Sequence, residues 1–342
     1  MKIPARRVIV LLSKYHGSNQ QLLALAKVIA GENVKPIQCE MRSRSSLLMG
    51  MYKLAITLNR KLGSTSLLAR FLKKACLKGS ISCLPGDLVL AKTRPFEIPA
   101  QLLAAGSEAK IGYIGSPSRF PHQDYDYLIS TPSTPTASAY LELDVLPTSF
   151  TYQEYLALRS KQTINDQKTW LLLLGGDARG CEYTEKDWAT LISFILYSSN
   201  TYDVSWIIST SPRTGALVEK LLAQSLVSEK GFKGKLYLWG EMQQTCPKPL
   251  ELLARSDEVF VSEDSASMIS EAVVTRLPVI TFSSDESDMK NGLTLPLLTY
   301  LDSKRCLKRS TFASLSVDDI EDWKKDGFTS LTECWSEVNT LY

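Results

Sequence analysis

Short apolar runs alternate with amphipathic helical stretches in the first half of the chain. Runs typical of buried strands lie at Val8–Leu12, Val34–Gln38, Leu88–Ala91, Lys110–Ile114 and Tyr127–Ser130, and helical patterns lie at Asn19–Gly31 and Pro99–Ala105. This alternation predicts a mostly parallel sheet with crossover helices. We therefore expect an α/β domain over residues 1–150, which the Ser-, Thr- and Pro-rich residues 131–150 close.

A second alternation begins at Thr169, after an expected linker of residues 151–168. Strands are predicted at Trp170–Leu174, Val204–Ser209, Lys235–Trp239, Glu258–Val261 and Val279–Phe282, and helices at Thr184–Ser198, Gly215–Leu226 and Lys248–Ser256. The pattern predicts a second doubly wound domain over residues 169–310. Helices at Ser316–Lys325 and Leu331–Leu341 are expected within residues 311–342, with packing back on the first domain as one option.

Composition narrows the class of protein. A chain of 342 residues with 44% hydrophobic residues suits two globular domains. The seven cysteines are scattered without a Cys-x-x-Cys pair, and there are two histidines, which argues against zinc and against a disulfide framework. The first residues, MKIPARRVIVLLSKYHG, read as a strand and not as a signal peptide. We therefore expect a cytoplasmic protein without a membrane span.

The net charge of +3 conceals a strong asymmetry. Residues 1–95 hold 17 Lys and Arg against three acidic residues, and no acidic residue occurs between Met41 and Gly86. Apolar residues in that segment follow helical spacing, which predicts two basic amphipathic helices broken near Gly63–Ser66. The segment fits a solvated face packed on a core, or a surface that binds anionic membrane. Nucleic acid is disfavoured because Tyr52 and Phe71 are its only aromatic residues.

Four turns in the second domain follow predicted parallel strands, where open α/β sheets bind ligands. They are Gly175-Gly176, Ser209–Thr214, Trp239-Gly240 and Glu263–Glu271. The glycines permit close backbone approach, and Arg213 offers a planar fork for a diphosphate. Trp239 offers a stacking surface for a base. Together the turns predict a nucleotide-diphosphate site at one edge of the sheet.

The last of these turns opens a predicted helix. A helix N-terminus presents backbone N–H groups and a positive dipole, which favour an anion such as a pyrophosphate. Asp264, Ser265 and Ser267 lie at this start, and Glu271 lies further along, where its carboxylate could accept from a ribose hydroxyl. The alternative is purely structural: Ser265 or Asp264 caps the helix, and Glu271 is a solvated charge.

Several motifs resemble one family. They are Lys14–Gln20 after the first strand, Leu173–Gly176, Ile207–Thr214 and Asp264–Ala272. Two doubly wound domains with the nucleotide site in the second resemble GT-B glycosyltransferases. In these segments the chain more specifically resembles the mitochondrial-fission-factor-like (Elm) family of plants and bacteria. Some bacterial members of that family are regarded as outer-core lipopolysaccharide glycosyltransferases. The resemblance implies a GT-B-like α/β fold, with two doubly wound Rossmann-like domains and an interdomain cleft.

The resemblance also implies a metal-independent transfer of sugar from a nucleotide-sugar to a lipid-linked glycan at the inner membrane surface, with no cofactor. His16 is the candidate base. Lys14, Gly17, Asn19 and Arg94 are candidates for acceptor binding. The candidate donor residues are Gly175, Gly176, Ser209, Thr210, Ser211, Arg213, Trp239, Asp264, Ser265, Ser267, Met268 and Glu271.

The chain departs from the family at three places. Pro212-Arg213 replaces the usual Arg pair, and Lys92-Thr93-Arg94 replaces the usual Gly-Arg-Arg. The usual His-Asp is missing around Thr131–Tyr140, which weakens the case for a catalytic or acceptor role there.

The sequence also bears on three alternatives to a metal-independent glycosyltransferase. One is a non-catalytic membrane-surface adaptor that keeps a degenerate sugar-nucleotide fold. A nicotinamide-dependent enzyme is not supported, because no GxGxxG follows the first strand. Asp124-Tyr125-Asp126 could suggest a metal-dependent DxD site, but the triplet precedes a strand, and we interpret it as a turn with two polar caps.

Overall fold

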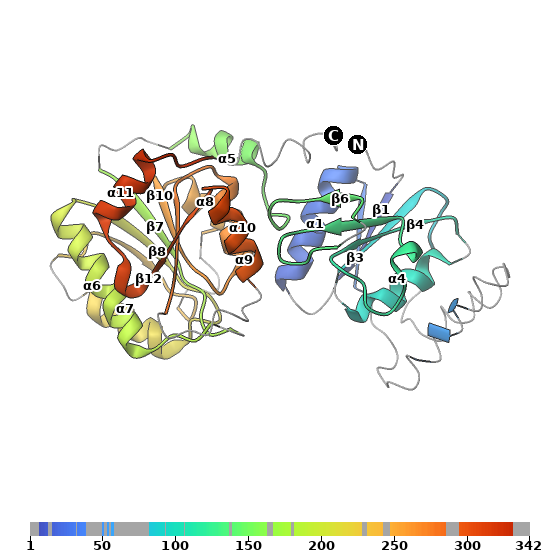
Figure 1. Cartoon of the computed structure of the whole chain (residues 1–342), viewed down its shortest axis with the longest axis horizontal. Helices are drawn as coiled ribbons and strands as arrows, with labels where there is room; N and C mark the ends of the chain where they lie inside the picture. Colours follow the sequence, from blue (N-terminus) through green and yellow to red (C-terminus); the bar gives the residue numbers. More distant parts are fainter. Residues whose placement is uncertain are drawn as a thin grey trace. The chain divides into compact units, whose positions relative to one another are not determined.

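The protein is described by a computed structural model. It covers residues 7–12, 16–31, 33–38, 50, 53–54, 56–57, 82–92, 94–105, 107–136, 139–162, 167–178, 181–227, 231–241, 247–284 and 294–330. Lys14, most of the basic segment 41–86 and the expected helix Leu331–Leu341 lie outside these residues. The chain divides into two compact units, with the break between Ser149 and Phe150 (Figure 1).

The first unit contains a six-stranded sheet in which every neighbouring pair is parallel, in the order β2-β1-β3-β4-β5-β6. The strands are β1 Arg7–Leu12, β2 Val34–Gln38, β3 Asp87–Lys92, β4 Lys110–Ile114, β5 Tyr127–Ser130 and β6 Leu141–Glu142. The helices are α1 His16–Ala30 and α4 Glu97–Ala104, with short 3₁₀ turns η1 Arg94–Phe96 and η2 His122–Asp124.

Successive residues of β1 point to opposite faces of this sheet, as strand geometry requires. Val8 and Val10 pack with α1 in one core cluster, whereas Ile9 and Leu11 pack with α4 in the other. All four are fully buried. The near-continuous apolar run that predicted this strand is thus explained by helices on both faces.

The second unit contains another six-stranded parallel sheet, in the order β12-β11-β10-β7-β8-β9. The strands are β7 Thr169–Leu173, β8 Ser205–Ser209, β9 Gly234–Tyr237, β10 Glu258–Ser262, β11 Val279–Ser283 and β12 Lys308–Thr311. The helices are α5 Tyr152–Arg159, α6 Glu185–Thr201, α7 Ala216–Val227, α8 Pro249–Leu253, α9 Ala266–Val274, α10 Leu295–Ser303 and α11 Val317–Lys325, with a 3₁₀ turn η4 at Phe312–Ser314.

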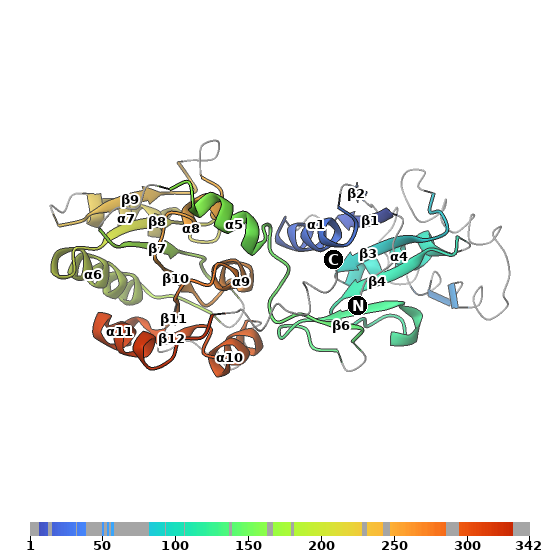
Figure 2. The same cartoon turned by 90° about the horizontal axis from the view of Figure 1, so that it is seen from above.

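Helices cover both faces of this second sheet. Figures 1 and 2 show α6, α7 and α11 on one face and α8, α9 and α10 on the other. An aromatic cluster fills the first face, where the Trp170 ring centroid lies 5.3 Å from that of Trp206 and 5.0 Å from that of Phe260. The predicted class, α/β with two doubly wound Rossmann-like units, is confirmed. The expected cleft between the domains stays a prediction.

The boundaries differ from the expected ones in two places. Within the expected linker, α5 is held to the second unit by Arg159, which ion-pairs with Asp257 at 2.6 Å and donates to the Ser256 carbonyl at 2.5 Å. Within the expected terminal helices, α11 buries Val317 and Ile320 in the second unit's core. Both helices therefore belong to the second unit.

Among the helices in the described part of the chain, none is both long and apolar enough to cross a bilayer.

Candidate functional site

The order of strands in the second sheet places a topological switch point between β7 and β10. The chain runs from β7 outward to β8 and β9, and then returns to the other side of β7 for β10, β11 and β12. Loops that follow adjacent strands diverge at such a point and leave a crevice at the carboxyl ends. The two loops concerned are Gly175-Gly176 after β7 and Glu263–Ser265 after β10, both predicted as ligand-binding turns.

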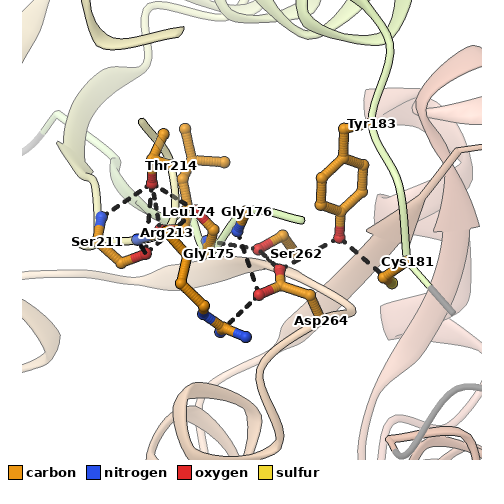
Figure 3. A network of polar contacts seen from close by, with 10 residues as sticks. All are labelled: Leu174, Gly175, Gly176, Cys181, Tyr183, Ser211, Arg213, Thr214, Ser262 and Asp264. Atoms are coloured by element: carbon orange, nitrogen blue, oxygen red, sulfur yellow. Dashed lines mark hydrogen bonds and ion pairs between the residues drawn. The ribbon is translucent and has the colours of Figure 1, made fainter. Parts of the chain in front are cut away.

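Asp264 is the centre of a polar network at this switch point (Figure 3). Its Oδ1 accepts from Ser262 Oγ at 2.6 Å and from the Tyr183 hydroxyl at 3.2 Å. Its Oδ2 accepts from Gly176 N at 3.2 Å and from Arg213 Nη2 at 2.6 Å. The carboxylate is fully buried, whereas the Arg213 side chain is 43% exposed. One carboxylate therefore ties together the turns after β7, β8 and β10.

Burial sets the protonation of this network. It raises the pKa of Asp264, while the hydrogen bond from Ser262 and the charge of Arg213 act in the opposite direction. Burial also raises the pKa of Tyr183, and it raises the pKa of Cys181 to about 11. Both groups therefore keep their protons at neutral pH, and Tyr183 acts as a donor to Asp264.

The two glycines after β7 are required by neighbouring protein atoms. A Cβ at Gly175 would lie 1.9 Å from Asp264 Oδ2, and one at Gly176 would lie 2.0 Å from the Arg213 carbonyl oxygen. The sequence predicted close approach at these glycines, and the structure shows that the approaching groups are the other two turns. The Gly-Gly pair thus makes the convergence of the three turns sterically feasible.

The turn after β8 is held by its own hydroxyl groups. Ser211 Oγ donates to the Gly175 carbonyl at 3.1 Å, and Thr214 Oγ1 donates to the Leu174 carbonyl at 3.1 Å and to that of Gly175. Ser209, Thr210 and Ser211 are all buried. The predicted donor-binding hydroxyls of Thr210 and Ser211 thus bond to protein groups, and the exposed group that the turn presents is the Arg213 guanidinium.

The helix that follows Asp264 begins without a side-chain cap. Ser265 is the N-cap of α9, and its side chain makes no capping hydrogen bond. By contrast, Thr151 and Thr184 complete capping boxes at α5 and α6. An anion at the start of α9 would take the place that a cap fills elsewhere. Further predicted residues lie on this helix at half-buried positions, namely Ser267, Met268 and Glu271.

A second buried carboxylate, Glu263, stabilises the other side of β10. It begins the predicted turn after this strand but was not among the candidate donor residues. Glu263, whose side chain is fully buried, accepts from Arg309 Nε and Nη2, both at 2.8 Å, and from Thr281 Oγ1 at 2.9 Å. This bidentate pair raises the pKa of Arg309. It links the carboxyl ends of β10, β11 and β12, so that the turn carrying Asp264 is fixed from both sides.

The first unit has an equivalent switch point between β1 and β3. His16 is the first residue of α1 and not, as expected, part of the preceding loop. Gly17 and the half-buried Asn19 follow in the same helix, and Arg94 is exposed in η1 after β3. The described parts of this edge thus include most of the residues predicted for acceptor binding.

The structure adds Lys92 to this edge. Lys92 ends β3, and its Nζ donates to Oε1 of Gln21 in α1. Burial lowers the pKa of Lys92 to about 8. The sequence marked Lys92 as a departure from the family pattern and gave no sign that it is partly buried.

The Asp124–Asp126 triplet is a structural turn before β5, as interpreted from the sequence. Asp126 accepts from Ile111 N at 2.8 Å and ion-pairs with Lys110 at 2.8 Å. Tyr125 donates to the buried Glu97 at 3.1 Å. Within the described residues, no three His, Cys, Asp or Glu side chains are grouped as a metal site needs.

Comparisons with known proteins give one family and several similar structures. No curated protein matches the sequence. MurG of Acinetobacter baumannii is 9% identical, with a TM-score of 0.48 over 98% of this chain and 95% of that one. The UDP-GlcNAc 2-epimerase of Methanocaldococcus jannaschii is 13% identical, with a TM-score of 0.48 over 96% and 92%. Identities this low say nothing about activity or substrate.

The family model described as mitochondrial fission ELM1 matches residues 16–339, which are nearly the whole chain. This chain belongs to the mitochondrial fission ELM1 family.

Proposed function

We propose that the chain is a glycosyltransferase whose second unit binds a nucleotide-sugar donor. The observation that carries the proposal is the convergence at one switch point of the half-exposed Arg213 guanidinium with the uncapped start of α9. A guanidinium and a helix N-terminus together favour a dianionic diphosphate. Glu271 lies on the same helix, where it is proposed to accept from a ribose hydroxyl.

Asp264 supports this role by orienting Arg213. A guanidinium has five N–H donors, and Asp264 accepts from Nη2. Donors on the exposed side of the fork remain for phosphate oxygens. Because Asp264 is itself held by Ser262, Tyr183 and Gly176, it fixes the direction in which the fork points. This preorganisation reduces the entropy lost when an anion binds.

In the proposed reaction, an acceptor hydroxyl oxygen forms a bond to the anomeric carbon of the donor sugar. The bond from that carbon to the diphosphate oxygen breaks, and its electron pair leaves with the nucleoside diphosphate. Arg213 and the dipole of α9 stabilise the charge that develops on the leaving group, without a cofactor or metal. The hydroxyl proton goes to a base, for which His16 at the start of α1 is the proposed residue.

The acceptor is assigned to the first unit. Lys14, Gly17, Asn19 and Arg94 are proposed to bind it. A lipid-linked glycan of the lipopolysaccharide or lipooligosaccharide core is the acceptor that the resemblance of the motifs suggests. The basic segment 41–86 supports a place at the cytoplasmic face of the inner membrane, because anionic lipid attracts such segments.

The donor site can be tested by calorimetric titration of the purified protein with UDP, GDP and CMP. We expect at least one nucleotide to bind. Arg213→Lys should weaken its binding by about tenfold or more, because lysine keeps the charge near Asp264 but loses the fork. Glu271→Ala should weaken it by about tenfold. Arg255→Ala is the matched control. Arg255 is exposed and lies before β10, at the amino ends of the strands, whereas the candidate site lies at their carboxyl ends.

Failure of all three nucleotides to bind the wild-type protein would refute the proposal. It would favour the second candidate, a non-catalytic membrane-surface adaptor. The observation that supports this candidate is the family itself, whose description refers to mitochondrial fission and not to an enzyme. Salt-sensitive binding to anionic vesicles without nucleotide affinity is the result that an adaptor predicts.

A further inference from the structure

A third buried carboxylate links the turns after β8 and β9. Glu219 lies in the first turn of α7 and is only 8% exposed. One of its oxygens accepts from Thr210 Oγ1 at 2.5 Å, and its two oxygens lie 3.4 and 3.2 Å from Gly240 N. The Glu219 side chain therefore connects the residue after β8 to the turn after β9.

Thr210 extends this connection to Trp239. Its Oγ1 donates to Glu219 and accepts from Trp239 N at 2.8 Å, while Thr210 N donates to the Tyr237 carbonyl at 3.0 Å. Gly240 leaves room for the carboxylate, because a Cβ there would lie 2.7 Å from Glu219 Oε2. The backbone on both sides of Trp239 is thus fixed, while its side chain stays 43% exposed.

The chemistry of the partners explains why a carboxylate occupies this position. The Thr210 hydroxyl and the Gly240 N–H both donate, and a carboxylate accepts from both of them. A glutamine at this position would turn its NH₂ group, which is also a donor, toward one of the two. Among the described residues, no lysine or arginine ion-pairs with Glu219. A buried carboxylate without a cation is costly, and the N-terminal turn of α7 offsets only part of that cost.

We infer that Glu219 is a positioning residue for recognition of the nucleoside, which deepens the proposed function and rests on it. Glu219 holds the Leu238–Gly240 backbone so that the exposed Trp239 ring forms the surface on which the base stacks. Recognition is then divided: Arg213 and α9 bind the diphosphate, and Glu219 acts through Trp239 on the base. Loss of an aromatic stacking surface weakens base binding by about tenfold or more.

The test compares two ligands that share the diphosphate. The first ligand is inorganic pyrophosphate, and the second is UDP or GDP, whichever binds the wild-type protein more tightly. Their dissociation constants are measured for Glu219→Gln, Trp239→Ala and the double variant. We expect each single variant to weaken nucleotide binding by about tenfold and to leave pyrophosphate binding unchanged. The double variant should bind the nucleotide no more weakly than Trp239→Ala alone, because both substitutions remove the same stacking interaction with the base. Lys220→Ala, an exposed neighbour on α7, is the control.

Iodide quenching of Trp239 fluorescence in the ligand-free protein gives a second readout. The contribution of Trp239 is the difference in quenched fluorescence between a protein and the same protein with Trp239→Phe. This difference should change when Glu219→Gln is introduced. An unchanged signal would overturn the inference, as would equal weakening of nucleotide and pyrophosphate, or nucleotide binding that Glu219→Gln does not alter. Those results leave the proposed function intact. A wild-type protein that binds no nucleotide refutes both.

Discussion

At the scale of single residues, the candidate donor site depends on buried carboxylates that fix exposed groups. Asp264 directs the Arg213 guanidinium, and Glu219 directs the backbone that carries Trp239. The sequence predicted Arg213, Trp239 and Asp264 as candidate donor residues from their residue type and their position after strands. Tyr183 and Glu219 could not be found in this way, because their partners are 81 and 9 residues distant and nothing local marks the pairing.

The Gly175 position gives a prediction at this scale. Gly175→Ala should destabilise the protein by about 3 kcal/mol, because the new Cβ would overlap a carboxylate that is held by several hydrogen bonds. Gly215→Ala is the control. Gly215 has a φ of +81° and no atom within 4 Å of an added Cβ, so the change there should cost only about 1 kcal/mol of backbone strain.

Urea denaturation of the two variants measures both free energies of unfolding. Equal and small losses for Gly175→Ala and Gly215→Ala would show that the turn after β7 is not packed against Asp264 as described.

At the scale of elements, the sequence predicted the buried strands and missed those without an apolar signal. β12 reads Lys-Arg-Ser-Thr and is half-buried at a sheet edge, so it lacks the run that marks β10 and β11. β6 is two residues long. The missed helix α5 did carry a local sign, since Thr151 and Glu154 form a capping box that is readable as Thr-x-x-Glu.

The ion pair between Glu263 and Arg309 gives a prediction for these elements. Arg309→Met should destabilise the protein by about 3 kcal/mol, because it leaves a fully buried carboxylate without its cation. Combining it with Glu263→Gln should recover part of that loss, since the uncompensated charge is then removed. Chemical denaturation of the two single variants and the double variant gives the coupling free energy. Additive losses would mean that the pair does not link β10 to β12.

At the scale of the whole molecule, each of the two units has a switch point that is lined by predicted site residues. The parallel order of each sheet follows from the alternation of apolar runs and helical patterns along the chain. Which strands become neighbours was not predicted, and that order brings the turns after β7 and β10 together. The expected linker of residues 151–168 is instead part of the second unit, because Arg159 binds α5 to that unit, a contact that no composition change marks.

A crystal structure of the full chain with the nucleoside diphosphate it binds tests the central claim most directly. We predict diphosphate oxygens within about 3.2 Å of the Arg213 guanidinium and of the first N–H groups of α9, with the base against Trp239. A nucleotide bound away from the carboxyl ends of β7 and β10, with Arg213 directed only at Asp264, would contradict the account.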